Sequence, residues 1–463
     1  MKQRLLIGAA LAVLLLWIAP ASDAQKTKSS AGWKAGLAKV IITPESPVWL
    51  AGYAARTKPS EGKIHDLYAK ALALEDVAGR RVVIVTSDLL GFPRGLAEAI
   101  AEQARKKFNL PRSQLVLTSS HTHTGPVLKS SLTGAYDMTA EQLAAVDAYT
   151  DQLRDKVVAL IGQAIQDLRP AKLSFGRGEA RFAVNRRQLT DGVMRIGVNE
   201  KGPVEWDVPV LSVQSLEGSL RGVLFGYACH NTTLTGEFYE FSGDYAGFAQ
   251  AELEQTHPGA QAMFVMGCGA DANPNPRSSL ELARRHGAEL AQSVEQVLKG
   301  RLSTVGGPVK TAFEKVTLPL VVPTREEFQS RLKDQNVYRR RHAERMLARL
   351  DRDGRLISEY PYPIQVMQFG NDLTFIAMGG EVVVDYLLRL KRELGANGLW
   401  VAGYSNDVMA YIPSVRILKE GGYEANDSML FYDLPGPWDQ VVEEKIISRI
   451  TELARRCGRR PVT

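Results

Sequence analysis

Three of the chain's seven histidines stand where they could bind a metal ion. His121 and His123 lie two positions apart in the segment Ser-His-Thr-His-Thr-Gly-Pro, and residues at that spacing on extended backbone point the same way. His230 and Glu381 follow two other apolar runs. Imidazole and carboxylate are the usual ligands of catalytic zinc. The pattern favours a metal site, and the alternative, in which each histidine is a hydrogen-bonded core residue, stays open at this point.

The elements that must position these residues follow from the apolar pattern. Short runs rich in Val, Ile, Leu and Phe alternate with segments of helical periodicity, which is typical of strands buried on both faces. The expected strands are 81–88, 115–118, 222–228, 262–266, 373–378 and 399–402. The expected helices are 95–108, 139–168, 246–255, 278–299, 382–394 and 438–456, with a charged surface helix over 325–353. The sequence therefore predicts an α/β fold, a layered mixed or mostly parallel sheet with helices on both faces.

Polar residues follow each expected strand. The six strand ends are Ser87-Asp88, Ser119 to Pro126, Cys229 to Asn231, Gly267 to Asp271, Gly379 to Glu381 and Gly403 to Asp407. In open α/β sheets, ligands bind beyond the carboxyl ends of the strands. We expect these segments to converge on one site at the C-terminal ends of the strands.

Composition and charge narrow the class of protein. With 45% hydrophobic residues the chain is globular, and we expect one α/β domain over residues 25–463. The net charge of +6 comes with no nucleic-acid motif, so nucleic acid is not an expected partner, and no protein partner is evident. Three cysteines give no dense disulfide framework, and whether Cys229 and Cys268 pair stays open.

The N-terminus has the pattern of a signal peptide. Basic residues precede an apolar run over 5–18 that is short for a membrane span, and small residues follow it. We expect cleavage near Ala24 and Gln25 and a periplasmic or secreted protein. An uncleaved N-terminal anchor is the alternative.

In these segments and in several others the chain resembles a known family, the neutral/alkaline non-lysosomal ceramidases. Segment 120–126 is similar to the family's Ser-His-Thr-His-Ser-Gly-Pro signature, and further similar blocks follow in the family's order across nearly the whole mature chain. These blocks are Gly62 to Asp66, Val85 to Leu89, Phe241 to Asp244, Gly380-Glu381, Asn406 to Ile412 and Gly422 to Ala425. The resemblance is to the family's catalytic domain, and the family's C-terminal immunoglobulin-like domain is not expected here.

The resemblance implies a ligand set and a chemistry. It places one Zn²⁺ per chain on His121, His230, Glu381 and Tyr411, although tyrosine is an unusual zinc ligand that the sequence alone would assign to packing. Zinc of this kind activates water and polarises a scissile carbonyl.

The resemblance also implies roles for residues around the metal. His123 would position or protonate the departing amine, and Tyr423 would stabilise the oxyanion. Arg186 completes the predicted catalytic set. One departure limits the match, because Asn273 stands where the family has a serine that is sometimes assigned as nucleophile.

The expected reaction is hydrolysis of an N-acyl amide, foremost ceramide to a long-chain base and a fatty acid. A lipid substrate would bring the protein into peripheral contact with a membrane surface. Two alternatives remain, a zinc hydrolase of another soluble amide or ester, and a non-catalytic protein that only binds a ligand in the crevice.

Overall fold

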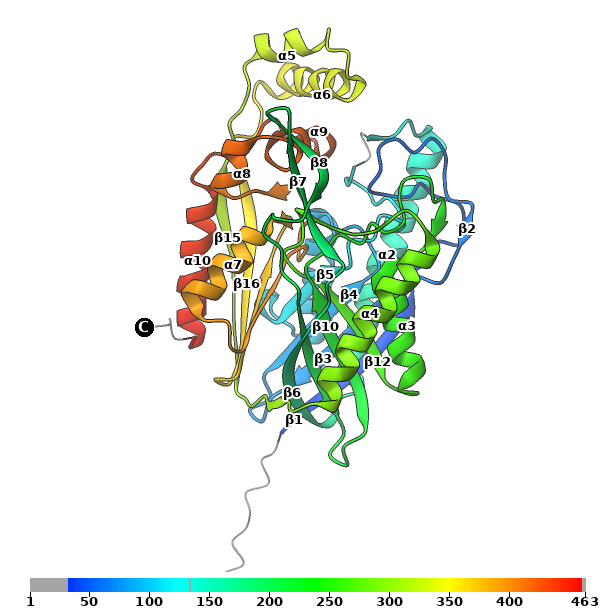
Figure 1. Cartoon of the computed structure of the whole chain (residues 1–463), viewed down its shortest axis with the longest axis vertical. Coiled ribbons are helices and arrows are strands. Elements are labelled where there is room, and N and C mark those ends of the chain that lie inside the picture. The colour runs from blue at the N-terminus through cyan, green and yellow to red at the C-terminus, as the bar shows by residue number, and fades with distance from the viewer. Residues whose placement is uncertain (1–31, 133–134, 460–463) are drawn as a thin grey trace, which may run out of the picture. The chain divides into compact units, whose positions relative to one another are not determined.

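Two β-sheets form the centre of the fold (Figure 1). The computed structural model describes residues 32–132 and 135–459, so the predicted signal peptide lies outside the described residues. The larger sheet has the order β12 (Gln261–Met266), β10 (Leu220–Tyr227), β9 (Asp207–Gln214), β6 (Arg169–Glu179), β1 (Trp33–Ile41), β3 (Tyr68–Glu75), β4 (Arg81–Ser87), β5 (Leu115–Ser119), with β14 (Ser303–Thr304) also on β6. The smaller sheet has the order β15 (Val309–Pro319), β16 (Glu359–Phe369), β17 (Leu373–Met378), β19 (Leu399–Ala402).

The two sheets pack face to face. One apolar cluster joins Val82 and Ile84 of β4 to Phe375 of β17 and Trp400 of β19, so it lies between the sheets. The intervening β4 residues, such as Val83, belong to a different cluster formed with helices. The alternation follows from the two-residue period of a strand, which sends successive side chains to opposite faces. The order of layers is therefore helix, sheet, sheet, helix.

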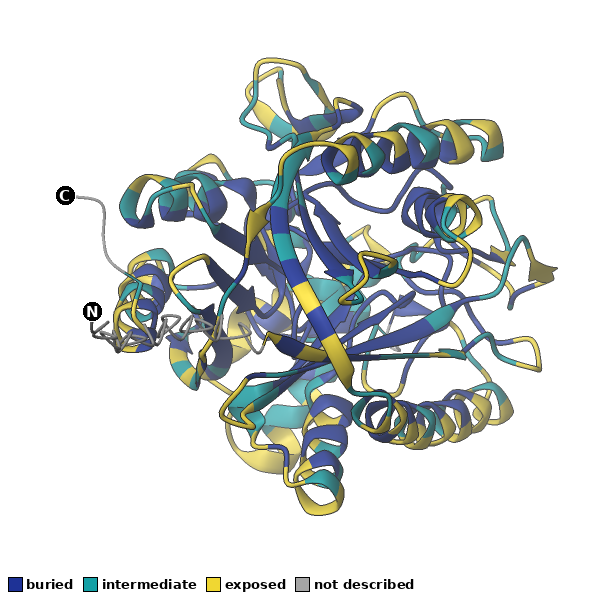
Figure 2. Cartoon of the chain, turned by 90° about the horizontal axis from the view of Figure 1, so that it is seen from below, coloured by how far each residue is buried: buried dark blue, intermediate teal, exposed yellow. Residues whose placement is uncertain are grey.

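Helices cover the outer face of each sheet. The helices α1 (Arg94–Phe108), α2 (Ala140–Gln166), α3 (Asp244–Thr256) and α4 (Leu280–Lys299) pack on the larger sheet, and α7 (Val384–Leu394) and α10 (Val442–Cys457) pack on the smaller one. Figure 2 shows the result, with buried strands inside and helices that expose their outer sides. Each of these helices buries one apolar stripe, as amphipathic surface helices do.

The predicted mixed α/β fold is confirmed. Strand pairing is parallel in β4–β5, β10–β12 and β17–β19, and antiparallel in the other pairs of the two sheets, so the sheets are mixed rather than mostly parallel. One detail differs from the expectation of helices on both faces of a sheet. The apolar runs are buried on both faces because a second sheet covers one face and helices cover the other.

A helical arm connects β15 to β16. The expected single helix over 325–353 is two helices, α5 (Arg325–Arg331) and α6 (Val337–Asp353), which lie at the top of the molecule in Figure 1. The break has a local cause, because the Asn336 side chain accepts hydrogen bonds from the backbone N–H groups of Tyr338 and Arg339 and so starts a new helix.

Short elements complete the fold around the strand ends. They are β2 (Gly62–Lys63), β11 (Glu240–Phe241), β7 (Ala183–Thr190), β8 (Val193–Asn199), β13 (Ala272–Pro274), β18 (Glu381–Val382), β20 (Tyr411–Ile412), α8 (Val415–Glu420), the π-helical turn Tyr423–Asp427 and α9 (Met429–Tyr432).

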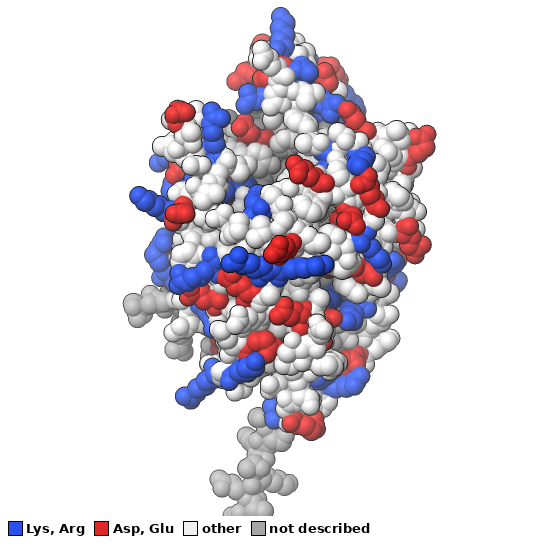
Figure 3. All heavy atoms as spheres, turned by 45° about the vertical axis from the view of Figure 1, so that its right-hand side comes forward, with Lys and Arg blue, Asp and Glu red and all other residues white. Residues whose placement is uncertain are grey.

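Cys229, Cys268 and Cys457 are buried free thiols. Among the described helices, none is long and apolar enough to cross a membrane. On the face shown in Figure 3, basic and acidic side chains are interspersed.

Candidate metal centre and active site

Short strand pairings bring the four predicted metal ligands together. His121 follows β5 and His230 follows β10, and an isolated parallel bridge between Thr122 and Asn231 joins the two loops. Glu381 begins β18, which pairs in parallel with β20 so that Glu381 lies opposite Tyr411. The strands that precede the histidines and Glu381, namely β5, β10 and β17, belong to the parallel pairs of the two sheets, whose carboxyl ends meet here.

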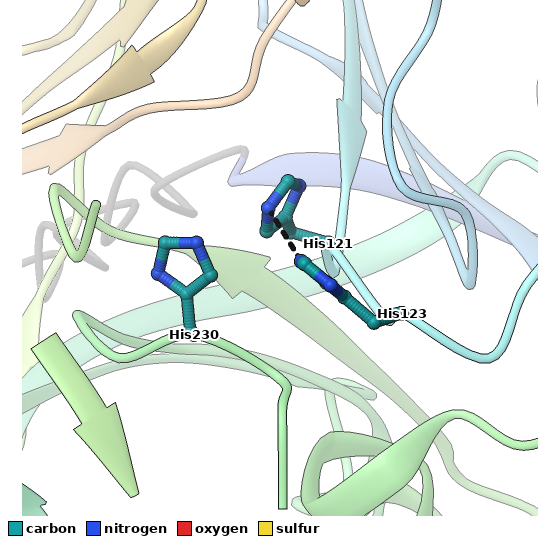
Figure 4. A group of neighbouring side chains, drawn as sticks. All are labelled: His121, His123 and His230. Carbon is teal, nitrogen blue, oxygen red and sulfur yellow. Dashed lines mark hydrogen bonds between the residues drawn. The ribbon is translucent and has the colours of Figure 1, made fainter. Parts of the chain in front are cut away.

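The ligand atoms converge closely. His121 Nε2 and His230 Nε2 lie 3.0 Å and 3.1 Å from the same Glu381 oxygen, Oε2. The Tyr411 hydroxyl is 3.3 Å from His230 Nε2, and His123 Nε2 is 3.1 Å from His121 Nε2. Figure 4 shows the three imidazole rings close together, with His121 and His123 on one loop and His230 on another. All of these side chains are buried, so few solvent molecules compete for their lone pairs.

Backbone carbonyl groups determine which ring nitrogen carries the hydrogen in His121 and His230. His121 Nδ1 lies 2.7 Å from the Leu90 carbonyl oxygen and His230 Nδ1 lies 2.9 Å from that of Gly269. Because a carbonyl only accepts, each Nδ1–H donates and each Nε2 presents its lone pair to the centre. Two imidazole lone pairs and a carboxylate oxygen within about 3 Å repel one another unless a proton or a cation lies between them. The backbone carbonyls thus orient the rings as metal-binding histidines are usually oriented, and the donor set fits zinc.

Burial keeps the imidazoles in the form that a metal requires. Burial, reinforced by Arg186, lowers the pKa of His230 to about 4. Burial also holds the pKa of His123 well below its usual value, so both rings are neutral at pH 7. Burial raises the pKa of the Tyr411 phenol, and the Arg186 guanidinium 3.0 Å from its oxygen opposes that rise. Arg186 therefore favours the phenolate form that a ligand would need.

Two residues at the centre have left-handed backbone. His121 has φ 59° and Tyr404, whose ring centroid is 4.3 Å from that of His121, has φ 50°. Non-glycine residues rarely adopt this region, and such positions cluster at functional sites because the surrounding structure must hold them there. In this chain they place the His121 and Tyr404 rings against each other.

A cavity of about 320 Å³ opens onto the centre. Its walls are mostly aromatic and aliphatic, with Tyr53, Tyr136, Ile196, Tyr423, Phe431 and Tyr432 among the lining residues. Its polar lining comes from a few groups, namely His121, His123, Arg186, Thr232, Asn273, Arg277, Glu381 and Tyr411. An apolar pocket with a small convergent set of polar groups is the usual form of a small-molecule site.

The three predicted catalytic residues all line this cavity. His123 lies beside the ligand histidines, and its buried Nδ1 has no hydrogen-bond partner among the residues that the structure describes. Arg186 donates to the Tyr411 hydroxyl and is 3.4 Å from His230 Nε2. The Tyr423 ring lies edge-on to that of Tyr411, at a centroid distance of 5.3 Å. All three side chains therefore lie where a molecule in the cavity could contact them.

Asn273 also lines the cavity, at the position where the sequence departs from the family. Its side-chain oxygen is within 3.5 Å of Arg186 Nη1 and 3.4 Å of the Thr232 hydroxyl, and both groups can donate to it. An amide side chain offers no nucleophilic hydroxyl, so no reaction of this chain can use one at this position.

Sequence reasoning missed three residues of the site. The hydroxyl groups of Tyr404 and Tyr432 both donate to Glu381, on Oε2 and Oε1 respectively. Glu424 forms a buried ion pair with Arg186, with Nε 2.8 Å from Oε1. Tyr404 lies in the predicted strand end Gly403 to Asp407, and Glu424 lies in the block Gly422 to Ala425 that resembles the family. No sequence pattern indicated Tyr432.

The fold and the centre define a mixed α/β protein with a buried histidine and carboxylate site at the ends of its strands. The sequence profile of the family described as neutral/alkaline non-lysosomal ceramidase, N-terminal, matches residues 33–290. The chain belongs to this family.

Individual relatives agree with that assignment. The chain is 26% identical over 255 residues to the neutral ceramidase of Pseudomonas aeruginosa, a match that covers 52% of this chain and 37% of the relative. Neutral ceramidase of Drosophila melanogaster is 23% identical over 273 residues, covering 53% of this chain and 36% of that protein. The matched segments therefore span little more than a third of these relatives.

Solved structures extend the similarity in fold. The crystal structure of neutral ceramidase from Pseudomonas aeruginosa superposes with a TM-score of 0.70 at 21% identity, covering 94% of this chain and 76% of that one. A structure titled ceramidase complexed with C2 gives the same TM-score at 19% identity and covers 94% and 77%. The fold is thus shared over nearly all of this chain.

Proposed function

We propose that this chain is a zinc-dependent hydrolase of N-acyl amides, with ceramide as the foremost candidate substrate. The observation that carries the proposal is the convergence of His121, His230 and Glu381 within about 3 Å at the base of an apolar-walled cavity. Membership of the ceramidase family supports the choice of bond. The products from ceramide would be a long-chain base and a fatty acid.

His121, His230, Glu381 and Tyr411 would hold the zinc ion. When bound, zinc polarises a carbonyl group and lowers the pKa of water so that it attacks at neutral pH. The protein supplies the buried, preorganised donor set, with the histidine rings fixed by the carbonyls of Leu90 and Gly269. Tyr404 and Tyr432 hold the Glu381 carboxylate by hydrogen bonds and limit its rotation.

The remaining cavity residues act on the substrate. Arg186 and Tyr423 lie on one wall, where they can donate to the carbonyl oxygen as negative charge develops on it. His123 lines the cavity with its Nε2 beside His121, where it would position or protonate the departing amine. The geometry assigns no nucleophile to Asn273, in agreement with a reaction in which water attacks.

The function is tested on metal-loaded protein with a ceramide labelled in its acyl chain. We expect wild-type protein to release labelled fatty acid and the His121→Ala variant to release none above background. Turnover of short N-acyl compounds or esters without turnover of ceramide would select the alternative of a soluble substrate, which the asparagine at position 273 motivates. A metal-loaded protein that retains a ligand but cleaves no member of an amide and ester panel would establish a binding protein instead.

We also propose that the chain is exported and meets its lipid substrate at a membrane surface. The basic and apolar N-terminal pattern supports cleavage before Gln25. N-terminal sequencing of protein from the envelope or medium is expected to start at Gln25. A sequence beginning at Met1 in exported protein would contradict cleavage and favour the uncleaved anchor.

A further inference from the structure

One wall of the cavity carries a guanidinium group without a carboxylate partner. Arg277 lines the cavity, half-buried, and its Nη2 donates a 2.9 Å hydrogen bond to the Tyr53 hydroxyl. Its Nε is buried and has no hydrogen-bond partner within the described part of the chain. The Tyr53 ring in turn lies edge-on to that of His123, at a centroid distance of 4.8 Å. The Tyr53 side chain therefore contacts both Arg277 and His123 of the proposed reacting centre.

The acidic groups nearby are engaged elsewhere. Glu381 contacts His121 and His230, and the Asp244 carboxylate accepts hydrogen bonds from the backbone N–H groups of Leu234 and Tyr245. Among the described residues Arg277 forms no ion pair, in contrast to Arg186, which pairs with Glu424. A half-buried guanidinium that lacks an anion is poorly compensated for the water it has lost.

A second cation, Arg56, contacts Tyr53 without itself lining the cavity. The Arg56 side chain is 3% exposed, and its guanidinium lies 5.1 Å from the centroid of the Tyr53 ring. Among the described residues it donates to carbonyl oxygens, those of Ala51, His123 and Phe238. Tyr53 thus contacts two guanidinium groups, and neither forms an ion pair in the described part of the chain, although the buried Asp244 carboxylate acts on Arg277 at longer range.

We propose that Arg277 and Tyr53 bind an oxyanion on the substrate, a carboxylate, sulfonate or phosphate close to the scissile amide. The inference narrows the proposed hydrolase to anionic N-acyl amides as its preferred substrates, so ceramide, which is neutral, would bind less well than an anionic amide of the same size. The planar guanidinium fork suits such groups because it can donate two parallel hydrogen bonds to one oxyanion. This inference rests on the proposed function for its account of turnover, but the binding preference can be measured separately.

Two substrates of matched size test the preference. N-lauroylglycine and N-lauroylethanolamine differ chiefly in a carboxylate against a hydroxymethyl group. We expect kcat/KM of wild-type protein to be about 10- to 100-fold higher for the glycine amide, the range for a charged hydrogen bond in a partly desolvated site. The Arg277→Gln substitution is expected to lower this ratio at least about 10-fold, with Arg277→Lys in between. N-lauroyltaurine distinguishes sulfonate from carboxylate recognition, and preference for either anion supports the inference.

A charge-matched control distinguishes an effect of Arg277 in the cavity from an effect of the overall positive charge of the protein. Arg285 is exposed on α4 and does not line the cavity, so Arg285→Gln removes one positive charge and is expected to leave the substrate ratio unchanged. An equal ratio in wild type and Arg277→Gln, with Arg277→Lys also unchanged, would overturn the inference.

Binding of non-hydrolysable analogues keeps this inference distinct from the proposed hydrolysis. The Kd values of N-dodecylsulfonylglycine and N-dodecylsulfonylethanolamine are compared by calorimetry in wild type and Arg277→Gln. A preserved preference for the anion without any turnover would refute hydrolysis and leave the anion site standing. Equal Kd values in wild-type protein would refute the anion site whether or not amides are cleaved.

Discussion

The His121→Ala and Glu381→Ala variants are expected to lose both the bound metal and turnover. Each substitution removes a ligand atom from a centre in which His121 Nε2 and Glu381 Oε2 are 3.0 Å apart. Loss of one ligand leaves the remaining lone pairs less able to hold the cation, and loss of the cation removes the activation of water and carbonyl. We expect wild-type protein to contain one zinc per chain by elemental analysis, and kcat/KM to fall by at least about three orders of magnitude in the variants.

Two control substitutions make this result specific. His257→Ala changes a histidine that pairs with Glu295 and does not line the cavity, so metal and turnover should persist. Asn273→Ala changes a cavity residue whose oxygen faces Arg186 and Thr232, so the metal should stay bound even if turnover falls. Equal zinc content in wild type and His121→Ala would refute the ligand assignment, as would full activity after chelation and dialysis.

The Arg186→Met variant is expected to lose both activity and stability. The Arg186 and Glu424 side chains are 6% and 1% exposed, so the substitution leaves a buried carboxylate with Arg187 as its remaining cationic partner. Breaking a buried ion pair from one side typically costs about 3–5 kcal/mol, and the contact of Glu424 with Arg187 places the expected loss at the lower end. The Tyr411 oxygen also loses its donor, so we expect kcat to fall about 100-fold or more.

Stability and activity are separated by changing the other partner. Glu424→Gln keeps the Arg186 charge beside Tyr411 but weakens its position, so we expect a similar loss in the free energy of unfolding and a smaller loss of kcat. Denaturant unfolding gives the first quantity and steady-state kinetics the second. If Arg186→Met retains kcat within about twofold while Glu424→Gln does not, Arg186 has no direct role in the reaction.

Much of the secondary structure could be read from apolar periodicity. All six expected strands and six expected helices exist, with ends that differ by a few residues. Each strand has a short apolar run and each helix has apolar residues at helical spacing, and both patterns can be recognised from local sequence. Two of the strands that were not predicted, β1 and β16, have weaker patterns. β1 includes Gly36 and two lysines, and β16 includes two prolines, so tertiary packing and pairing rather than propensity make them strands.

The candidate site was predictable in its ligand types but not in its arrangement. His121, His230 and Glu381 could be recognised because each follows an apolar strand. Tyr411 was suggested only by resemblance, and its position opposite Glu381 arises from a two-residue strand pairing that has no sequence signal of its own. The Tyr432 hydroxyl reaches Glu381 from a segment 51 residues away, a contact that no local pattern can indicate.

Which segments are buried, and which polar residues end them, could be predicted from the amino-acid pattern because periodicity and composition act locally along the chain. Tertiary packing placed a second sheet over the inner face of the first, and no pattern could indicate this because a strand buried on both faces has the same apolar sequence whether a sheet or a helix covers it. Tertiary packing also decided which charges are paired. Arg186 and Arg277 are the same residue type, yet folding places one against Glu424 and leaves the other facing the cavity with the Tyr53 hydroxyl. Such pairing depends on contacts between residues far apart in the chain, and that is the physical reason it cannot be read from local sequence.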